Sequence, residues 1–457
     1  MLSRLLRKKP IGHSPSSSSL RRSLTAFDLI FMGIGAIIGA GVFVLTGIVA
    51  ATKAGPAVVI SYSIAGIACL FAGLAYAELA ASVGGTGSAY SYAYAGFGEF
   101  VAWIIGWDLL LEYSMSVSTV AIGWSGYVSD LLESINIPFP IMLTKSPFDG
   151  GIINLPALLI ILALAYILST GVKQSARFNT GIVFIKLLTI AVFIIAAIPN
   201  VKWHNWQDFN PFGFTGIMEG AALVFFAYIG FDALSTAVEE TKDPQQNIPI
   251  GILVSLVVCT LIYIIVSALL TGIAPYETLN VRSPVANALL QIGDKVAAGF
   301  VAAGAIAGLT TVMLVMYYGL TRIILAMCRD GLMPSALAKI NMGTHTPTTI
   351  IYSTGCIMAI VAGFAPIHRA AELVNIGTLS AFTFVCLGMI VMRYTHPTLP
   401  RPFKLPLHPL FPLLGVISCI YLMIYLSAIT WLRFFIWATV GLFVYFSYGI
   451  HHSKLKK

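Results

Sequence analysis

Long apolar segments, each bounded by a few polar or charged residues, follow one another along the whole chain of 457 residues. An α-helix rises about 1.5 Å per residue, so roughly 20 apolar residues cross the hydrocarbon of a bilayer. The pattern therefore predicts twelve membrane-spanning helices, at 27–51, 56–82, 99–129, 154–171, 178–198, 216–240, 248–272, 295–327, 347–365, 370–393, 410–429 and 431–450. Two shorter stretches, 84–98 and 284–292, predict helices that lie along the membrane surface.

The composition agrees with a protein embedded in lipid. Hydrophobic residues make up 58% of the chain and charged residues only 10%, against about 45–50% and 25% in an ordinary globular protein. So few charges cannot cover a soluble surface, and the predicted fold class is an all-α polytopic membrane protein. The net charge of +8 does not indicate a nucleic-acid partner, because the basic residues gather at the chain ends and in short loops.

The basic residues also predict an orientation. If the amino terminus is cytoplasmic, 18 Lys and Arg at the chain ends, in loops or near span ends fall on the cytoplasmic side and 7 on the other, and Lys186 alone lies deep within a span. This bias follows the positive-inside rule. It predicts a multi-pass protein of the plasma membrane (a bacterial inner membrane) with both termini in the cytoplasm. The six cysteines are far apart and form no CxxC, so neither a disulfide framework nor a metal site is predicted.

Two of the predicted spans carry glycines at the depth of the membrane centre. The first contains Gly39 and Gly41 in the segment GIGAIIGAG, and the sixth contains Gly230, followed by Asp232. Glycine weakens a helix by about 1 kcal/mol relative to alanine, so clustered glycines favour unwinding. The two Ile-Gly pairs are 191 residues apart, and the same shift places the fifth span on the tenth.

Spans 1–5 and 6–10 are therefore interpreted as two five-helix repeats, which an odd number of crossings places in opposite orientations. The predicted division is a basic, Ser-rich tail (1–24), the first repeat (25–199), an extracellular loop (200–215), the second repeat (216–393), helices eleven and twelve (394–450) and a second tail (451–457). Interrupted helices at matched positions of inverted repeats are typical of the binding site of a secondary transporter. The alternative is that the glycines only allow helices to pack closely.

Unwinding leaves backbone groups free where no water is available. Free N–H groups at the start of a half-helix favour a carboxylate, and free carbonyls accept hydrogen bonds from an ammonium. A zwitterionic amino acid offers both groups, which makes it the substrate class that the two breaks predict.

Several stretches of the chain resemble the amino acid–polyamine–organocation transporters, and among them the bacterial cationic amino acid transporter branch. The matching stretches are GIGAIIGAGVFVLTG (33–47), GSAYSYAY (87–94), GEFVAWIIGWDLLLEY (98–113), FFAYIGFDALSTAVEETKDPQQNIPIGI (225–252), DGLMP (330–334) and RPFKLP (401–406). The resemblance implies a LeuT-type fold, with a 5+5 inverted repeat, broken helices 1 and 6 and two extra C-terminal helices. The larger animal members carry two further spans, and a proline common before the GSAY stretch is absent here.

The resemblance also implies roles for individual residues. The substrate carboxylate would meet the backbone N–H groups of Gly39, Ala40 and Gly41. The ammonium would meet carbonyls around Ile37, Phe226, Ala227 and Ile229. Phe226 and Phe231 would act as aromatic gates, with packed apolar side chains as the alternative. If Met316 lines the pocket, it shortens it and favours small neutral side chains over arginine.

Charged side chains inside the predicted spans are candidates for ion coupling. A charged Lys186 near the bilayer centre costs about 2.5–3.5 kcal/mol or more, so it should face a cavity or exchange its proton. In sodium-coupled relatives a cation lies close to this face, and the hypothesis is that Lys186 replaces it as the proton carrier, with Tyr263 nearby. Glu112, Asp232 and Asp108 are candidates for attracting a cationic side chain or relaying a proton, or alternatively for holding helices together.

These observations predict a proton-coupled symporter of small neutral and/or cationic L-amino acids that works by alternating access. The alternatives are an exchanger, a sodium-coupled carrier, or an amino acid sensor that does not transport. GxSxG, HExxH and GxxxxGK[ST] motifs are absent, so neither an enzyme nor a bound cofactor is predicted. The expected partners are an L-amino acid, H⁺ and membrane lipid, with room for a small single-span accessory protein.

Overall fold

The computed structural model describes residues 7–8, 24–83, 89–134, 136–137, 140–171, 176–344 and 346–455. Most of the predicted amino-terminal tail, the beginning of the stretch 84–98, Lys173 and the last two lysines lie outside the described residues. The described residues form helices, turns and two isolated β-bridges but no strand. The predicted all-α class is therefore confirmed.

A helix occupies each of the twelve predicted spans. In chain order these are α2 (Ala26–Ile37), α4 (Val58–Val83), α6 (Glu99–Ser134), α7 (Leu155–Ser169), α8 (Ala176–Ala197), α9 (Gly213–Val224), α10 (Pro244–Ile273), α12 (Lys295–Arg329), α13 (Thr348–Phe364), α14 (Ile367–Thr395), α15 (Leu410–Ile424) and α16 (Ala428–Val444). Across the described ranges, eight helical stretches are long and apolar enough to cross a membrane, and four further apolar helices have 10–17 residues. Shorter helices complete the bundle, namely α3 (Thr46–Val49), α5 (Ala89–Gly96), α11 (Pro284–Gln291) and α17 (Ile450–His452).

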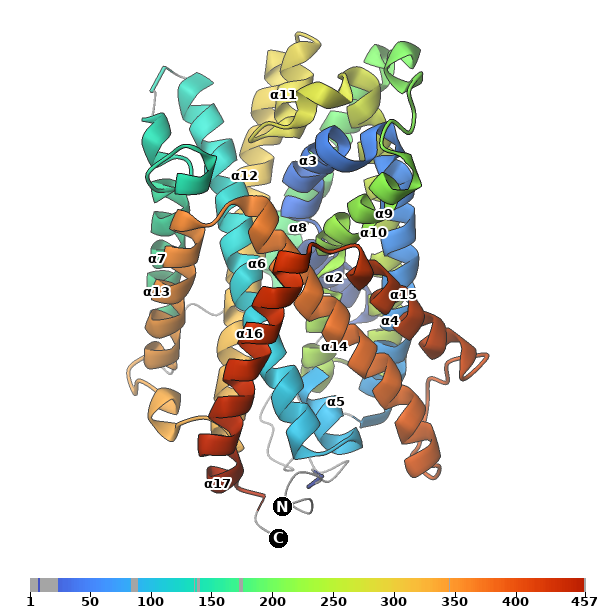
Figure 1. Cartoon of the computed structure of the whole chain (residues 1–457), viewed down its shortest axis with the longest axis vertical. Helices are drawn as coiled ribbons and strands as arrows, with labels where there is room; N and C mark the ends of the chain where they lie inside the picture. Colours follow the sequence, from blue (N-terminus) through green and yellow to red (C-terminus); the bar gives the residue numbers. More distant parts are fainter. Residues whose placement is uncertain are drawn as a thin grey trace.

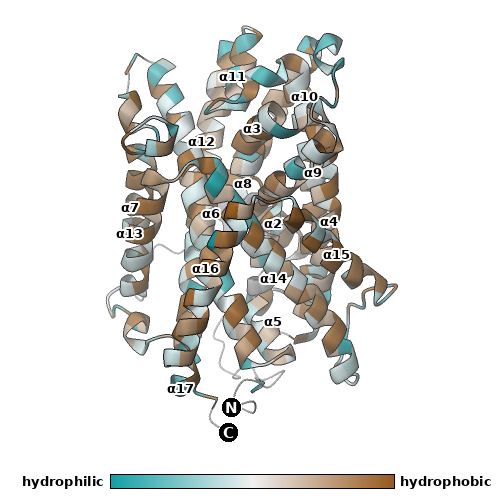
Figure 2. Ribbon diagram, viewed as in Figure 1, coloured by the Kyte–Doolittle hydropathy of each residue, from teal (hydrophilic) through white to brown (hydrophobic). Residues whose placement is uncertain are grey.

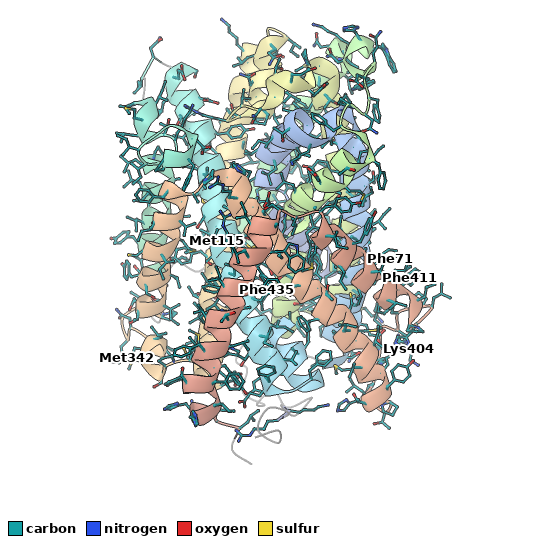
Figure 3. All side chains as sticks on the ribbon, in the orientation of Figure 1. Phe71, Met115, Met342, Lys404, Phe411 and Phe435 are labelled. Carbon is teal, nitrogen blue, oxygen red and sulfur yellow. The ribbon has the colours of Figure 1, made fainter. Side chains whose placement is uncertain are left out.

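The long helices stand roughly side by side, and α6 runs through the middle of the bundle (Figure 1). Hydrophilic residues concentrate at the two ends of the molecule, while the outer faces between them are largely apolar (Figure 2). Many large apolar side chains are exposed there, as expected where lipid rather than water is the solvent. Phe71 of α4 and Phe411 of α15 stack with their ring centroids 5.9 Å apart on one such flank (Figure 3).

Both termini lie at the same end of the bundle (Figure 1). The backbone N–H of Glu99, at the start of α6, donates to the carbonyl of Arg7 at 2.8 Å. The carboxylate of Glu99 accepts hydrogen bonds from Tyr445 at 3.1 Å and from Ser453 at 2.5 Å. Termini that meet on one side require an even number of crossings.

Two crossings are interrupted near the middle of the bundle. Helix α2 ends at Ile37, Ile38 is extended with ψ 107°, and the chain resumes as a π-helical turn at Gly41–Leu45, followed by α3. Helix α9 ends at Val224, and two 3₁₀ segments, η8 (Phe225–Tyr228) and η9 (Phe231–Glu240), flank Gly230. Gly230 has φ +119°, a conformation open to glycine and strained for other residues. The two breaks fall at the positions that the glycine pattern predicts.

Candidate functional site

The two breaks cross each other in antiparallel fashion. A Cβ atom on Gly41, after the first break, would run into the Cα and Cβ atoms of Ala227, before the second break. A Cβ atom on Gly230, after the second break, would lie 2.9 Å from the carbonyl oxygen of Ala36, before the first break. The residue before each break thus touches the residue after the other. Glycine is required at both contacts because an added Cβ atom would overlap Ala227 at the first and would crowd the Ala36 carbonyl and the Met316 methyl group at the second.

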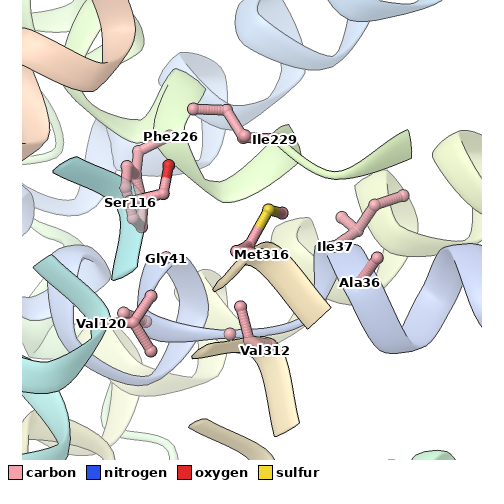
Figure 4. Close-up of a pocket in the computed structure, with 11 residues that line it drawn as sticks. Ala36, Ile37, Gly41, Ser116, Val120, Phe226, Ile229, Val312 and Met316 are labelled. Carbon is pink, nitrogen blue, oxygen red and sulfur yellow. The ribbon is translucent and has the colours of Figure 1, made fainter. Parts of the chain in front are cut away.

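A small internal cavity lies beside this crossing. Its walls come from α2 and the first break, from η8, from α6 and from α12 (Figure 4). The lining residues are Ala36, Ile37, Gly39, Ala40, Gly41, Ser116, Val120, Phe226, Ile229, Val312 and Met316. The cavity has room for roughly one water molecule, so a larger ligand requires the walls to move apart.

Seven of the eight residues predicted to bind substrate line this cavity. The eighth, Ala227, lies behind the wall, where it packs against Gly41 and its carbonyl accepts a hydrogen bond from Tyr263. Sequence reasoning missed Ala36, Ser116, Val120 and Val312. The last three could have been found from helical spacing, because Val312 precedes Met316 by four residues and Ser116 follows Glu112 by four.

Lys186 of α8 reaches the first break. Its ammonium donates to the carbonyl oxygens of Gly35 at 2.7 Å and Ile38 at 3.1 Å. The side chain is 1% exposed, and its stem passes Gly308 of α12, where a Cβ atom would meet the stem at 3.1 Å. No carboxylate of the described residues forms a salt bridge with it. The positive charge of Lys186 is therefore stabilised by the carbonyl dipoles of Gly35 and Ile38.

Tyr263 of α10 connects the two breaks. Its hydroxyl lies 3.0 Å from the carbonyl oxygen of Ile37 and 2.8 Å from that of Ala227. A hydroxyl has one proton, so only one of the two carbonyls can receive it at a time. Ile37 lies between the two residues that Lys186 binds, so the polar groups of Lys186 and Tyr263 face three carbonyls at the end of α2 and the start of the first break.

The carboxyl groups predicted to relay charge lie on the side of the cavity nearer the termini. Asp108 and Glu112 face Gly377 of α14, where a Cβ atom would lie 3.0 Å from Oδ1 of Asp108. Asp232 at the start of η9 accepts a hydrogen bond from Tyr113 at 2.7 Å. All three acids are at least 94% buried, and both oxygens of Asp108 and of Glu112 have no hydrogen-bond partner among the described residues.

Phe226 and Phe231, the two predicted gates, have different surroundings. Phe226 lines the cavity. Phe231 does not, and packs between Tyr76 and Phe382 with ring centroids 5.5 Å and 5.0 Å away. It belongs to an aromatic layer between the cavity and the end of the bundle that carries the termini.

At that end of the bundle lies an ion pair between a buried carboxylate and a partly exposed arginine. Glu78 of α4 accepts hydrogen bonds from Arg393 of α14 at 2.8 and 2.5 Å and from the N–H of Leu405 at 2.7 Å. Arg401 lies 3.5 Å from the same carboxylate. A bidentate pair with a backbone donor is among the stronger arrangements of this kind. It fixes the loop 396–409 across the ends of α4 and α14.

The opposite end is closed by polar contacts of α11 and the half-helices. Asp130 of α6 accepts a hydrogen bond from Ser283 at 2.5 Å, and Arg282 lies 3.9 Å from its carboxylate. Lys53, after the first break, pairs with Glu219 of α9 at 2.6 Å. Polar contacts thus lie at both ends of the described bundle, and the cavity between them has room for roughly one water molecule.

The chain resembles characterised membrane carriers over nearly its whole length. A profile of the family described as amino acid permease matches residues 24–446. The chain is 48% identical to the methylthioribose transporter of Bacillus subtilis (strain 168), over 100% of both chains. It is 47% identical to the branched-chain amino acid permease of the same organism, over 98% of this chain and 97% of that one. It is 31% identical to human cationic amino acid transporter 4, over 99% and 91% of the two chains.

Proposed function

We propose that this chain, which belongs to the amino acid permease family, is a proton-coupled carrier of small neutral L-amino acids that works by alternating access. The observation that carries the proposal is the crossing of two broken helices at a buried cavity. Membership of the family makes it a multi-pass membrane transporter rather than an enzyme. The substrate, the coupling ion and the roles of individual residues are the proposed part.

The backbone of the breaks would bind the part that all amino acids share. Gly39, Ala40 and Gly41 begin the second half of the first crossing, where N–H groups have no preceding helical turn to bond. Such groups favour a carboxylate. The ammonium would bind carbonyls around Ile37, Phe226, Ala227 and Ile229. The Tyr263 hydroxyl lies within hydrogen-bond distance of two of these carbonyls, and each keeps a lone pair for a second donor.

The remaining walls favour a neutral side chain. Val120, Phe226, Val312 and Met316 are apolar, and no charged residue is among those that line the cavity. A buried cation without a partner is costly, so arginine or lysine gains little from this pocket. The relative named as a branched-chain amino acid permease has the same general class of substrate.

A cationic substrate is the second candidate, and one observation favours it. Glu112 lies one helical turn from Ser116, and neither of its carboxylate oxygens has a hydrogen-bond partner among the described residues. A long cationic side chain that passed Ser116 would reach this acid and its neighbour Asp108. The relative named as a cationic amino acid transporter agrees with that possibility.

Lys186 is proposed as the coupling group. When protonated, it binds the carbonyls of Gly35 and Ile38 and fixes the first break. After losing the proton the amine is neutral, so its hydrogen bonds to the two carbonyls become weaker and the half-helix ending at Ile37 is held less tightly. Proton binding would thus favour one arrangement of the break and proton release the other, which is the requirement for coupling.

The direct test is uptake by the purified chain in proteoliposomes. We would impose a pH gradient, a sodium gradient or neither, and measure the uptake of labelled valine. A panel of twenty amino acids and methylthioribose would compete, the last because a relative carries that name. Uptake driven by pH supports the proposal. Uptake driven by sodium, exchange without either gradient, or binding without flux would identify the sodium-coupled carrier, the exchanger or the sensor.

The orientation is proposed from the basic residues. Placing both termini in the cytoplasm of the cell gives the 18-to-7 bias described above. The pair formed by Glu78 and Arg393 would then be the cytoplasmic closure, and the Asp130–Ser283 contact the outer one. Protease accessibility of the carboxyl terminus in sealed right-side-out vesicles tests this placement, and cleavage there would contradict it.

A further inference from the structure

Ser116 differs from the other hydroxyl residues of α6. Ser114, Ser118 and Thr119 each donate to the carbonyl four residues earlier, at 2.5, 3.0 and 2.8 Å. Hydroxyls inside helices commonly satisfy themselves in this way. Ser116 does not, and its oxygen has no hydrogen-bond partner among the described residues although the residue is 2% exposed.

The position of this hydroxyl is informative. Ser116 lines the cavity on the α6 wall, near Phe226 and facing the break region together with Val120 (Figure 4). The other side chains on the wall are apolar, so Ser116 provides the one side-chain hydrogen-bonding group among the described lining residues. Burying a hydroxyl without a partner is unfavourable, and a ligand that bonds to it removes that cost.

The two breaks already provide backbone partners for a carboxylate and an ammonium. The Ser116 hydroxyl on the α6 wall is therefore available to bind the side chain of the amino acid, which is the part that differs between substrates. On the basis of the proposed function, we propose that the Ser116 hydroxyl hydrogen-bonds a side-chain hydroxyl of the substrate and selects threonine and serine over their apolar isosteres.

The physical reason is that leaving a buried polar group without a hydrogen bond costs more free energy than a typical hydrogen bond contributes. Threonine and valine have nearly the same shape, as do serine and 2-aminobutyrate. Valine in this cavity leaves the Ser116 hydroxyl unpaired, whereas threonine gives it a partner. A pocket that must pair a buried hydroxyl discriminates against a ligand that lacks the matching group.

The test compares these two isosteric pairs in two variants. Inhibition constants for threonine, valine, serine and 2-aminobutyrate would be measured against labelled alanine uptake in proteoliposomes. Ser116→Ala removes the free hydroxyl, and Ser114→Ala removes one that is bonded within the helix. We expect Ser116→Ala to lower the threonine-to-valine preference about fivefold, with a similar change for the second pair. Ser114→Ala should leave both preferences as they are.

The outcomes separate this inference from the proposed function. Unchanged preferences in Ser116→Ala would overturn it, and so would an equal loss of affinity for all four ligands, because that indicates contact with the shared carboxylate or ammonium. Retained valine inhibition shows that the variant is folded. If no amino acid competes with any other in the unaltered protein, the proposed function itself fails.

Discussion

The ammonium of Lys186 lies 2.7 Å from the carbonyl oxygen of Gly35, in the last turn of α2 before the first break. Together with the bond to Ile38, this contact replaces the helical hydrogen bonds that unwinding removes. An isolated ammonium inside a bilayer is costly, and here carbonyl dipoles offset that cost. The stability of the break and the protonation of the lysine therefore depend on each other.

Replacing Lys186 should abolish the dependence of uptake on a pH gradient but leave substrate exchange in place. In Lys186→Ala the carbonyls of Gly35 and Ile38 lose their donor, and the site loses its titratable group. We expect uptake driven by a pH gradient to fall by about tenfold or more, whereas exchange of internal for external substrate persists. Both are measured in one liposome preparation, so the exchange signal controls for folding. Intact pH-driven uptake would rule out the proposed coupling role.

Adding a methyl group at Gly41 should disturb the crossing of the breaks. The new Cβ in Gly41→Ala would overlap the backbone of Ala227. Overpacking of this kind costs about 1–3 kcal/mol, so we expect a lower melting temperature in detergent and weakened substrate binding. Gly299→Ala is the matched control, because nothing lies within 4 Å of the added atom there. Equal melting temperatures for the two variants would contradict the close contact.

Shortening the side chain of Met316 should widen the range of substrates. Met316 lines the cavity, and its Cε atom would lie 2.9 Å from a Cβ placed on Gly230. In Met316→Ser we expect longer side chains to compete with alanine uptake about tenfold better than before. Uptake competition by leucine and arginine measures this. An unchanged ranking would mean that another wall limits the length of the pocket.

The contacts of Asp130 with Arg282 and Ser283 should stabilise the position of α11 by a small free energy. Its partners Arg282 and Ser283 precede α11, and the ion pair is partly exposed, so the contact contributes little to overall stability. In Asp130→Asn we expect hydrogen exchange of the α11 amides to rise about two- to fivefold. Glu133→Gln removes a charge from the same helix end and should leave that exchange as it is.

His408 should make the loop 396–409 sensitive to acid. Burial, and then the charge of Arg393, lower the pKa of His408 below its usual value. A lowered pKa means that folding favours the neutral imidazole, so its contribution is present above the unfolded-state pKa of about 6.5 and is lost as pH falls. Amide exchange of the loop, corrected for intrinsic rates, should increase between about pH 7 and pH 5. His408→Gln should reduce this pH dependence, and an identical profile would contradict it.

The fold was largely predictable because lipid imposes a simple rule. Every backbone polar group must be paired within its own segment, so crossings are long apolar helices that the sequence reveals directly. Both breaks were predictable for the opposite reason, since Gly39, Gly41 and Gly230 contradict that rule at the same depth. The inverted repeat stays a prediction, although the antiparallel crossing of the breaks agrees with it.

The site was predictable only in its backbone part. Ile37, Gly39 and Phe226 lie next to the breaks in sequence, and their place at the cavity follows from that. Val120 and Val312 come from helices distant in sequence, and only their four-residue spacing from Ser116 and Met316 connects them with the site. The hydroxyl of Ser116 stands out only when its missing hydrogen bond is known, which requires the packed structure.

The antiparallel crossing of the two breaks has a mechanical consequence. Gly41 packs against the Cα and Cβ atoms of Ala227, and Gly230 packs against the carbonyl of Ala36 and the methyl group of Met316, with no space for an added atom at either contact. Atoms in such close contact leave no room for one half-helix to move alone, so a displacement of one half-helix also displaces the other. The protein should therefore have few partly open forms, and liposomes that contain it should show little passive proton leak when no substrate is present.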